Sequence, residues 1–171
     1  MAVELEIKQL QAIGEHAEEL AELLIRVVED GASIGFLPPL PLAEALAYWE
    51  SVCGPEVILF IAKIDGHIVG SVQLHICSKL NGIHRVELAK LMTHPDYRRR
   101  GIGRLLMQHA EDRARREGKT LIVLDTREGD PSNLLYTSMG YSQAGRIPGY
   151  ALSADGSFDA TIIYYKSWGP A

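Results

Sequence analysis

The spacing of apolar and polar positions divides the first third of the chain into a strand, two helices and a loop. Residues 3–10 alternate apolar and polar side chains, as strands do, whereas residues 16–30 are rich in Ala, Leu and Glu at helical spacing. Residues 31–39 contain Gly and Pro and break both patterns, so we expect a loop there. Residues 41–52 predict a second helix that begins at or next to Pro41.

The middle of the chain predicts an antiparallel meander of three strands. Residues 57–64, 67–76 and 85–93 are each rich in β-forming apolar side chains. Asp65-Gly66 separates the first two runs, and Asn81-Gly82 precedes the third. Such dipeptides favour tight hairpin turns of type I′, in which both central residues need a positive φ.

The rest of the chain alternates helices and strands. In chain order, the pattern predicts a helix that follows Gly103 and ends near Gly118, a strand over 120–126, and a short helix from Asp130-Pro131 to Met139. Strands over 141–150 and 161–167 follow, with a turn at 153–157. Asp130 and Pro131 read as the N-cap and first turn of the short helix. The order βααβββαβαββ predicts one mixed α/β domain over residues 1–171, in which the strands flanking the longer helix lie parallel.

Composition and charge limit the classes of molecule that the protein is expected to bind. The chain has 171 residues and a net charge of −5, which argues against a general nucleic-acid binder. Residues 98–119 nevertheless carry eight Lys or Arg against three Asp or Glu, which favours a small anionic ligand. Since the chain has no apolar run long enough to span a membrane and opens without a signal-like segment, we expect a cytoplasmic protein with no membrane partner.

Cysteine and histidine suggest no further chemistry. Cys53 and Cys77 form no Cys-x-x-Cys motif, so we interpret them as buried, unreactive thiols. His75, His84 and His94 lack metal-ligand spacing, and we therefore expect no metal site.

The segment that opens the long helix predicts a pyrophosphate cradle. Two glycines, Gly101 and Gly103, let a bulky ligand approach the backbone, and a helix that begins there directs unpaired N–H groups at that ligand. Three arginines precede the first glycine and add positive charge. The segment is not a P-loop, because Arg104 and Leu105 stand where Lys and Ser or Thr would be needed. It is not a Rossmann turn either, because Leu106 replaces the third glycine.

The order Arg-x-x-Gly-x-Gly, together with the element order, resembles the GNAT (GCN5-related) N-acetyltransferases. The resemblance implies a mostly antiparallel sheet in which one parallel pair of strands splays apart, with acetyl-CoA as the donor. Its pantetheine arm would pair with the backbone of Leu91, Met92 and Thr93. The pyrophosphate would lie on the amides of Arg99, Arg100, Gly101, Ile102, Gly103 and Arg104, with Arg98 at the entrance.

The same resemblance proposes catalytic residues. Tyr136 falls in Leu-Tyr-x-x-x-Gly-Tyr and would act as general acid toward the departing thiolate. Glu87 and Asp125 would take the amine proton, directly or through one water, or would instead bind the acceptor's ammonium group. A backbone N–H near Met92 would stabilise charge on the thioester oxygen. One departure concerns Gly129, because many members of the family carry Asn at that position as a pantetheine contact.

Further segments resemble the tabtoxin-resistance branch of that family: 31–36, 81–87, 90–92, 124–126 and 148–150. We therefore expect a small amino-acid-like or toxin-like amine as acceptor, with tabtoxinine-β-lactam as the sharpest candidate. Phe36, Tyr141 and Tyr150 would form the walls of its site. A peptide or protein amine, or a non-catalytic acyl-CoA-binding module, remain the alternatives. The resemblance leaves a homodimer open.

Overall fold

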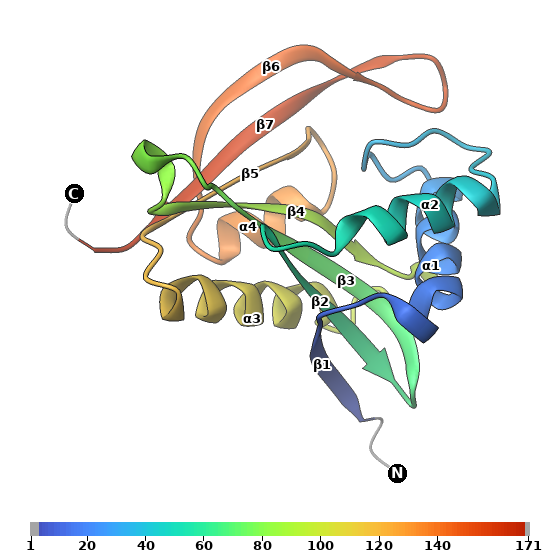
Figure 1. Ribbon diagram of the computed structural model, residues 1–171. Coiled ribbons are helices and arrows are strands. Elements are labelled where there is room, and N and C mark those ends of the chain that lie inside the picture. Colours follow the sequence, from blue (N-terminus) through green and yellow to red (C-terminus); the bar gives the residue numbers. More distant parts are fainter. Residues whose placement is uncertain (1–3, 170–171) are drawn as a thin grey trace.

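Seven strands form one sheet in the computed structural model, which describes residues 4–169 (Figure 1). The sheet order is β1-β2-β3-β4-β5-β7-β6, and within these residues only β4 and β5 pair in parallel. The strands are β1 (Leu5–Leu10), β2 (Val57–Ile64), β3 (His67–Ile76), β4 (Arg85–Thr93), β5 (Leu121–Arg127), β6 (Ser142–Leu152) and β7 (Phe158–Ser167). The predicted mixed α/β fold and its element order are confirmed.

Helices cover both faces of this sheet, and each face has its own apolar cluster. The helices are α1 (Ala17–Glu29), α2 (Leu42–Val52), α3 (Ile102–Arg116) and α4 (Ser132–Ser138), with short 3-10 helices η1 (Gly14–His16), η2 (Leu80–Gly82) and η3 (Pro95–Tyr97). The α1–α2 face buries Trp49 and Leu24, and the α3–α4 face buries Leu106 and Ile122. Alternation along the central strands explains this division, because successive side chains enter opposite clusters.

Of the two predicted hairpin turns, only the first is tight. Asp65 and Gly66 have φ values of 49° and 84°, as the type I′ prediction requires. The prediction for Asn81-Gly82 is wrong, because neither residue has a positive φ and the segment forms η2 instead. A Cβ on Gly82 would lie 2.5 Å from Cys77 Sγ, so this glycine serves close packing rather than a turn.

Two smaller expectations also change. Asp130 does not cap α4, because its carboxylate accepts a hydrogen bond from Arg127 Nε at 3.0 Å and the helix has Pro131 at its N-cap. Cys53 and Cys77 are free but half-buried rather than buried. Val3, expected in the first strand, lies outside the described residues. No helix within residues 4–169 is long and apolar enough to cross a membrane.

The parallel pair separates soon after it begins. β4 and β5 pair only from Arg85–Leu121 to Glu87–Val123, although β5 continues along β7 as far as Arg127. β4 also changes its register with β3, and Lys90 there has a φ of 56°. Such a bulge bends a strand. Beyond Glu87, the edge of β4 therefore faces an opening rather than a neighbouring strand.

A buried ion pair closes the far side of the α3–α4 face. The side chain of Glu111 on α3 is 6% exposed, and one of its oxygens lies 2.9 Å from Lys166 Nζ on β7. Lys166 also donates to the carbonyl of Met139 at 2.8 Å, just after α4. The pair thus joins a helix, a strand and the turn that leads into β6.

Replacing Lys166 by Met should destabilise the protein by about 3 kcal/mol, because it removes the nearer partner of the buried Glu111 carboxylate and leaves it only Arg115, whose Nη2 lies 3.7 Å away. Urea unfolding would measure this loss. The double substitution Glu111→Leu/Lys166→Met should recover most of the stability, because no unpaired charge then remains. Lys8→Met is the matched control, since Lys8 pairs with Glu6 at an exposed site. A Lys166→Met loss no larger than that of Lys8→Met would contradict the assignment.

Candidate functional site

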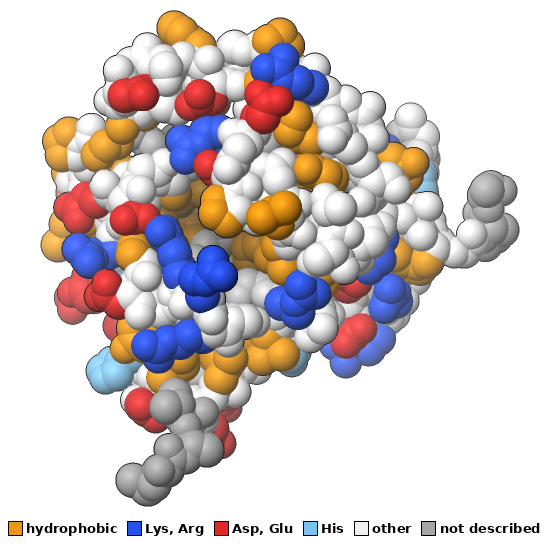
Figure 2. All heavy atoms as spheres, turned by 180° about the vertical axis from the view of Figure 1, so that it is seen from behind, with side chains coloured by type: hydrophobic (Ala, Val, Ile, Leu, Met, Phe, Trp, Pro, Cys, Tyr) orange, Lys and Arg blue, Asp and Glu red, His pale blue; other side chains and the backbone are white. Residues whose placement is uncertain are grey.

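An opening separates β4 from β5 beyond their last paired residues, Glu87 and Val123. Figure 2 shows the surface hollowed over the diverging ends of these strands, with apolar side chains inside and Lys and Arg side chains at the rim. Leu91 and Thr93 of β4 are half-buried and Met92 is buried. Because β4 pairs only with β3 at this level, its other edge is free to receive an extended ligand as an added strand.

The N-terminus of α3 lies at one end of this opening and presents unpaired amides. Gly101 is the N-cap and has a φ of 77°, which favours glycine. The first amide of the helix to donate within it is that of Leu105, to the Gly101 carbonyl at 3.0 Å. In residues 4–169, the amides of Gly101, Ile102 and Gly103 have no acceptor, and neither does that of Arg104. Such a row of N–H groups at the positive end of a helix dipole suits a phosphate.

Three of the four arginine side chains around this terminus contact other parts of the protein. Arg98 pairs with Asp30 at the end of α1, and Arg100 lies over the Tyr97 ring at 5.0 Å. Arg104 donates to Ser138 Oγ at 2.7 Å. Arg99 is exposed with a φ of 61°. Because a guanidinium has five N–H groups, these contacts leave arginine donors free, and they stand beside the unpaired backbone amides.

A Gly101→Ala substitution should raise the Kd for acetyl-CoA about tenfold, which corresponds to roughly 1.4 kcal/mol. The new Cβ would strain a positive φ and stand beside the free amides. Gly118→Ala is the matched control, because Gly118 has a φ of 73° just beyond the other end of α3 and also has open space around its Cβ position. Calorimetric titration of both variants would measure the difference. Equal effects on binding would contradict a cradle at Gly101.

The two predicted carboxylates lie on the α1–α2 face, beside the point where the strands separate. Glu87 and Asp125 are both exposed, and together with Tyr150 they line a hollow of about 150 Å³. Asp125 accepts a hydrogen bond from Thr161 Oγ1 at 2.9 Å. No ion pair occupies either carboxylate within the described part of the chain. Both carboxylates are therefore available to a ligand.

Tyr136 lies on the opposite face, in α4. It is 4% exposed, and its ring contacts those of Tyr141 and Tyr164 at 5.8 Å between centroids. Burial, and then the negative charge of Asp125, raise the pKa of the Tyr136 phenol well above its ordinary value. The phenol therefore keeps its proton at neutral pH. No hydrogen-bond partner occupies its hydroxyl within residues 4–169.

The sequence did not indicate the position of Lys90, which the β4 bulge turns toward the α1–α2 loop. Its ammonium donates to the Ile34 carbonyl and lies 5.7 Å from the centroid of the Phe36 ring. Burial lowers the pKa of Lys90, and the charges of Asp125 and Glu87 oppose that shift. Lys90 therefore anchors the loop next to the two carboxylates.

The expected acceptor walls are only partly brought together. Tyr150 is 56% exposed beside Asp125, and Phe36 is half-buried in the α1–α2 loop. The expectation for Tyr141 is wrong, because Tyr141 is buried in the α3–α4 cluster and packs on Tyr136. Tyr141 follows Gly140, and its side chain lies on the α3–α4 face of the sheet, opposite to Asp125 and Tyr150.

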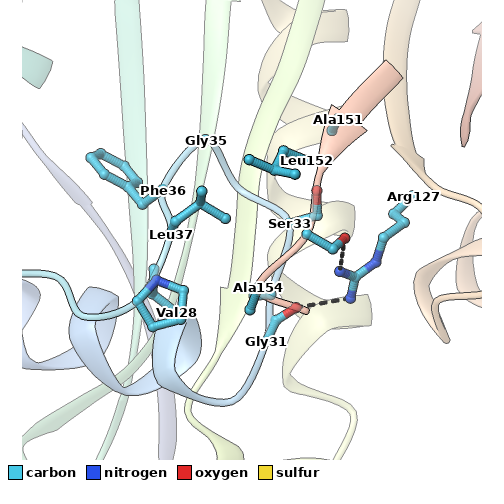
Figure 3. Close-up of a pocket in the computed structure, with 13 residues that line it drawn as sticks. Val28, Gly31, Ser33, Gly35, Phe36, Leu37, Arg127, Ala151, Leu152 and Ala154 are labelled. Atoms are coloured by element: carbon cyan, nitrogen blue, oxygen red, sulfur yellow. Dashed lines mark hydrogen bonds between the residues drawn. The ribbon is translucent and has the colours of Figure 1, made fainter. Parts of the chain in front are cut away.

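Phe36 lines a second hollow of about 240 Å³, which we call the Arg127 hollow (Figure 3). It lies between the α1–α2 loop and the end of β6, and its lining residues are Val28, Gly31, Ala32, Ser33, Gly35, Phe36, Leu37, Pro38, Arg127, Ala151, Leu152, Ser153 and Ala154. The sequence pattern did not indicate Arg127, because two of the groups that hold it, the Gly31 carbonyl and Ser153 Oγ, come from distant segments.

Comparison with known proteins places this geometry among acetyltransferases. Residues 17–141 match the Acetyltransferase (GNAT) family. An Azospirillum brasilense protein described as an uncharacterized N-acetyltransferase in the hisH-hisA intergenic region is 33% identical over 114 residues, which are 64% of this chain and 67% of that protein. The [ribosomal protein bS18]-alanine N-acetyltransferase of Escherichia coli K12 is 32% identical over 77 residues, or 44% of this chain and 52% of that protein. The match thus spans about half the length of the latter relative.

Solved structures share the fold. A GNAT-family acetyltransferase from Streptococcus pneumoniae superposes with a TM-score of 0.81 at 21% identity, covering 96% of this chain and all of the other. The Salmonella typhimurium protein yncA, a putative acetyltransferase solved with its cofactor acetyl-CoA, gives a TM-score of 0.79 at 18% identity, covering 97% of this chain and 96% of the other. At these identities the likeness establishes the fold alone.

Proposed function

Since the chain belongs to the Acetyltransferase (GNAT) family, we propose that it transfers an acetyl group from acetyl-CoA directly to the amine of a small acceptor. The observation that carries the proposal is the row of unpaired amides at the start of α3, directly beside the opening between β4 and β5. These two features provide one place for a diphosphate and one for an extended arm.

The residues of the opening fit acetyl-CoA. The amides of residues 99–104 would hold its pyrophosphate, and Gly101 would leave room for it. The free edge of β4 at Leu91, Met92 and Thr93 would hold the pantetheine arm through backbone hydrogen bonds. Arg98 would stand at the entrance, although its pairing with Asp30 makes it a weaker phosphate ligand. When bound, the donor supplies an activated acetyl group and a good leaving group.

Three side chains would transfer the protons of the reaction. Asp125 and Glu87 would accept the proton that the amine loses as the new C–N bond forms, or would first hold the acceptor as an ammonium ion. Tyr136 would give its proton to the sulfur as the C–S bond breaks, because its raised pKa keeps it protonated. The Met92 backbone N–H would stabilise the negative charge that develops on the acyl oxygen.

The acceptor we propose is a small amino-acid-like amine. The exposed carboxylates of Glu87 and Asp125 favour a cationic acceptor, and Phe36 and Tyr150 give its site apolar borders. Tabtoxinine-β-lactam is one candidate of this kind, supported by the similar segments around residues 31–36, 81–87 and 148–150.

A protein N-terminus is the second candidate acceptor. It is favoured by the relative from Escherichia coli, whose name states that it acetylates alanine of ribosomal protein bS18. The exposed rim at Ile147 and Tyr150 would leave room for a peptide. Mass spectrometry of peptides incubated with the enzyme and acetyl-CoA would detect this activity.

Thiol release from acetyl-CoA over a panel of about fifty amines, with tabtoxinine-β-lactam included, tests the proposal. We expect release only in the presence of particular small amines, with an equal amount of N-acetylated product. Acetyl-CoA binding without release over the whole panel would instead favour a non-catalytic acyl-CoA-binding module.

A further inference from the structure

We propose that the acceptor is an amine that also carries a carboxylate, and that Arg127 binds this carboxylate in the Arg127 hollow. The inference rests on the proposed function, because it assigns a specificity residue to the same acceptor site. An amino-acid-like acceptor already carries such a group, and the new element is the residue that binds it.

The charge of the hollow points to an anion. Arg127 is the only charged side chain among its lining residues, all of which belong to the described part of the chain. The rest of the wall combines the apolar side chains of Phe36, Leu37 and Leu152 with backbone and serine hydroxyl groups. Apolar surroundings strengthen the attraction of a guanidinium for an anion, because less water screens it. The apolar wall would meanwhile contact the carbon chain of the acceptor.

Arg127 is held in place but keeps donors free. Its Nε donates to Asp130 at 3.0 Å. One Nη2 hydrogen is directed at the Gly31 carbonyl at 2.9 Å (Figure 3), and one Nη1 hydrogen at Ser153 Oγ at 3.3 Å. A guanidinium has five N–H groups, so each terminal nitrogen retains one. Asp130 contacts Nε alone and leaves these two hydrogens for a carboxylate. A side chain fixed on three sides loses little freedom when it binds.

The position of Arg127 relative to Asp125 sets the length of the acceptor. The two residues are two positions apart on β5, so their side chains leave the same face about 6–7 Å apart. Thr126 between them faces α4, where it contacts Ser132. On β6, Tyr150 of the hollow at Asp125 is followed directly by Ala151 of the Arg127 hollow. An acceptor with its amine at Asp125 therefore extends along the sheet toward Arg127.

This arrangement would distinguish amines by the chemical group at the end of the molecule opposite to the amine. A straight amino acid with several methylene groups between its amine and its carboxylate spans both hollows. The corresponding carboxamide has the same shape but no charge, and leaves the Arg127 hydrogens with a weaker partner. A protein N-terminus would place a neutral peptide group near Arg127.

The test compares kcat/KM for 4-aminobutyrate, 5-aminovalerate and 6-aminohexanoate with that for the carboxamide of each, by thiol release. For the wild-type protein we expect at least one acid to exceed its amide by about tenfold or more. Arg127→Gln should remove that preference by lowering the rate of the acid while leaving the amide nearly unchanged. Arg146→Gln is the matched control, because Arg146 is exposed and pairs with Glu128 at 2.8 Å outside both hollows.

Three results would overturn the inference while leaving the proposed function intact: equal wild-type rates for acid and amide, a preference that survives in Arg127→Gln, or an equal loss with both acceptors, which would indicate a structural role. Arg127→Lys keeps the charge without the fork and should retain part of the preference, so it decides the matter if Arg127→Gln does not fold. No thiol release with any amine would overturn both proposals together.

Discussion

Replacing Tyr136 by Phe is expected to lower kcat by about 10²–10⁴-fold, the usual contribution of a general acid. The variant keeps the ring that packs against Tyr141 and Tyr164 and removes only the hydroxyl. The Kd for acetyl-CoA should therefore change little. Steady-state thiol release, together with calorimetric binding of acetyl-CoA, separates the two effects.

Tyr165→Phe is the control for this substitution, because Tyr165 lies on β7 and is 40% exposed. Its kcat should match that of the wild type. Since burial and the charge of Asp125 raise the pKa of Tyr136, any alkaline decline of wild-type kcat between pH 7 and about 10 should not come from Tyr136, and should persist in Tyr136→Phe. A kcat for Tyr136→Phe within threefold of wild type would remove the general-acid assignment.

Replacing Asp125 by Asn is expected to lower kcat/KM for the amine by about 100-fold. The amide can still accept the hydrogen bond from Thr161, so the strand pairing at this point should survive. Whether this loss lies in kcat or in KM distinguishes the two roles proposed for Asp125. If Asp125 takes the amine proton, kcat falls; if it binds the ammonium group, KM rises and kcat is retained.

Asp112→Asn is the control for Asp125→Asn, because it removes a carboxylate from an exposed position on α3, away from the opening. Both kinetic constants should then equal those of the wild type. Unchanged kcat/KM in Asp125→Asn would show that Asp125 neither takes the proton nor binds the acceptor.

Local patterns predicted most of the fold. The β-rich runs at 57–64, 67–76 and 85–93 coincide with β2, β3 and β4. Asp65-Gly66 was informative because a type I′ turn demands a backbone conformation that few residues adopt. The hairpin prediction for Asn81-Gly82 failed because the same dipeptide also occurs in longer loops. Here the glycine is required by its close packing on Cys77 and not by a positive φ.

The site was harder to predict because its parts depend on tertiary contacts. A regular alternation along β4 gives no sign of the bulge at Lys90, which turns that side chain toward the Ile34 carbonyl. Tyr141 was expected in the acceptor wall. The chain turns at Gly140, which has a φ of 87°, and Tyr141 is buried in the α3–α4 cluster instead. Arg127 is held by Gly31 and Ser153, which are far from it along the chain.

All proposed steps require that the start of α3 holds the diphosphate of acetyl-CoA beside the opening between β4 and β5. Isothermal titration of the wild-type protein with acetyl-CoA, and separately with CoA, tests this claim most directly. We predict a measurable heat with both ligands at one site per chain. The absence of heat with both would contradict the cradle and every step proposed from it.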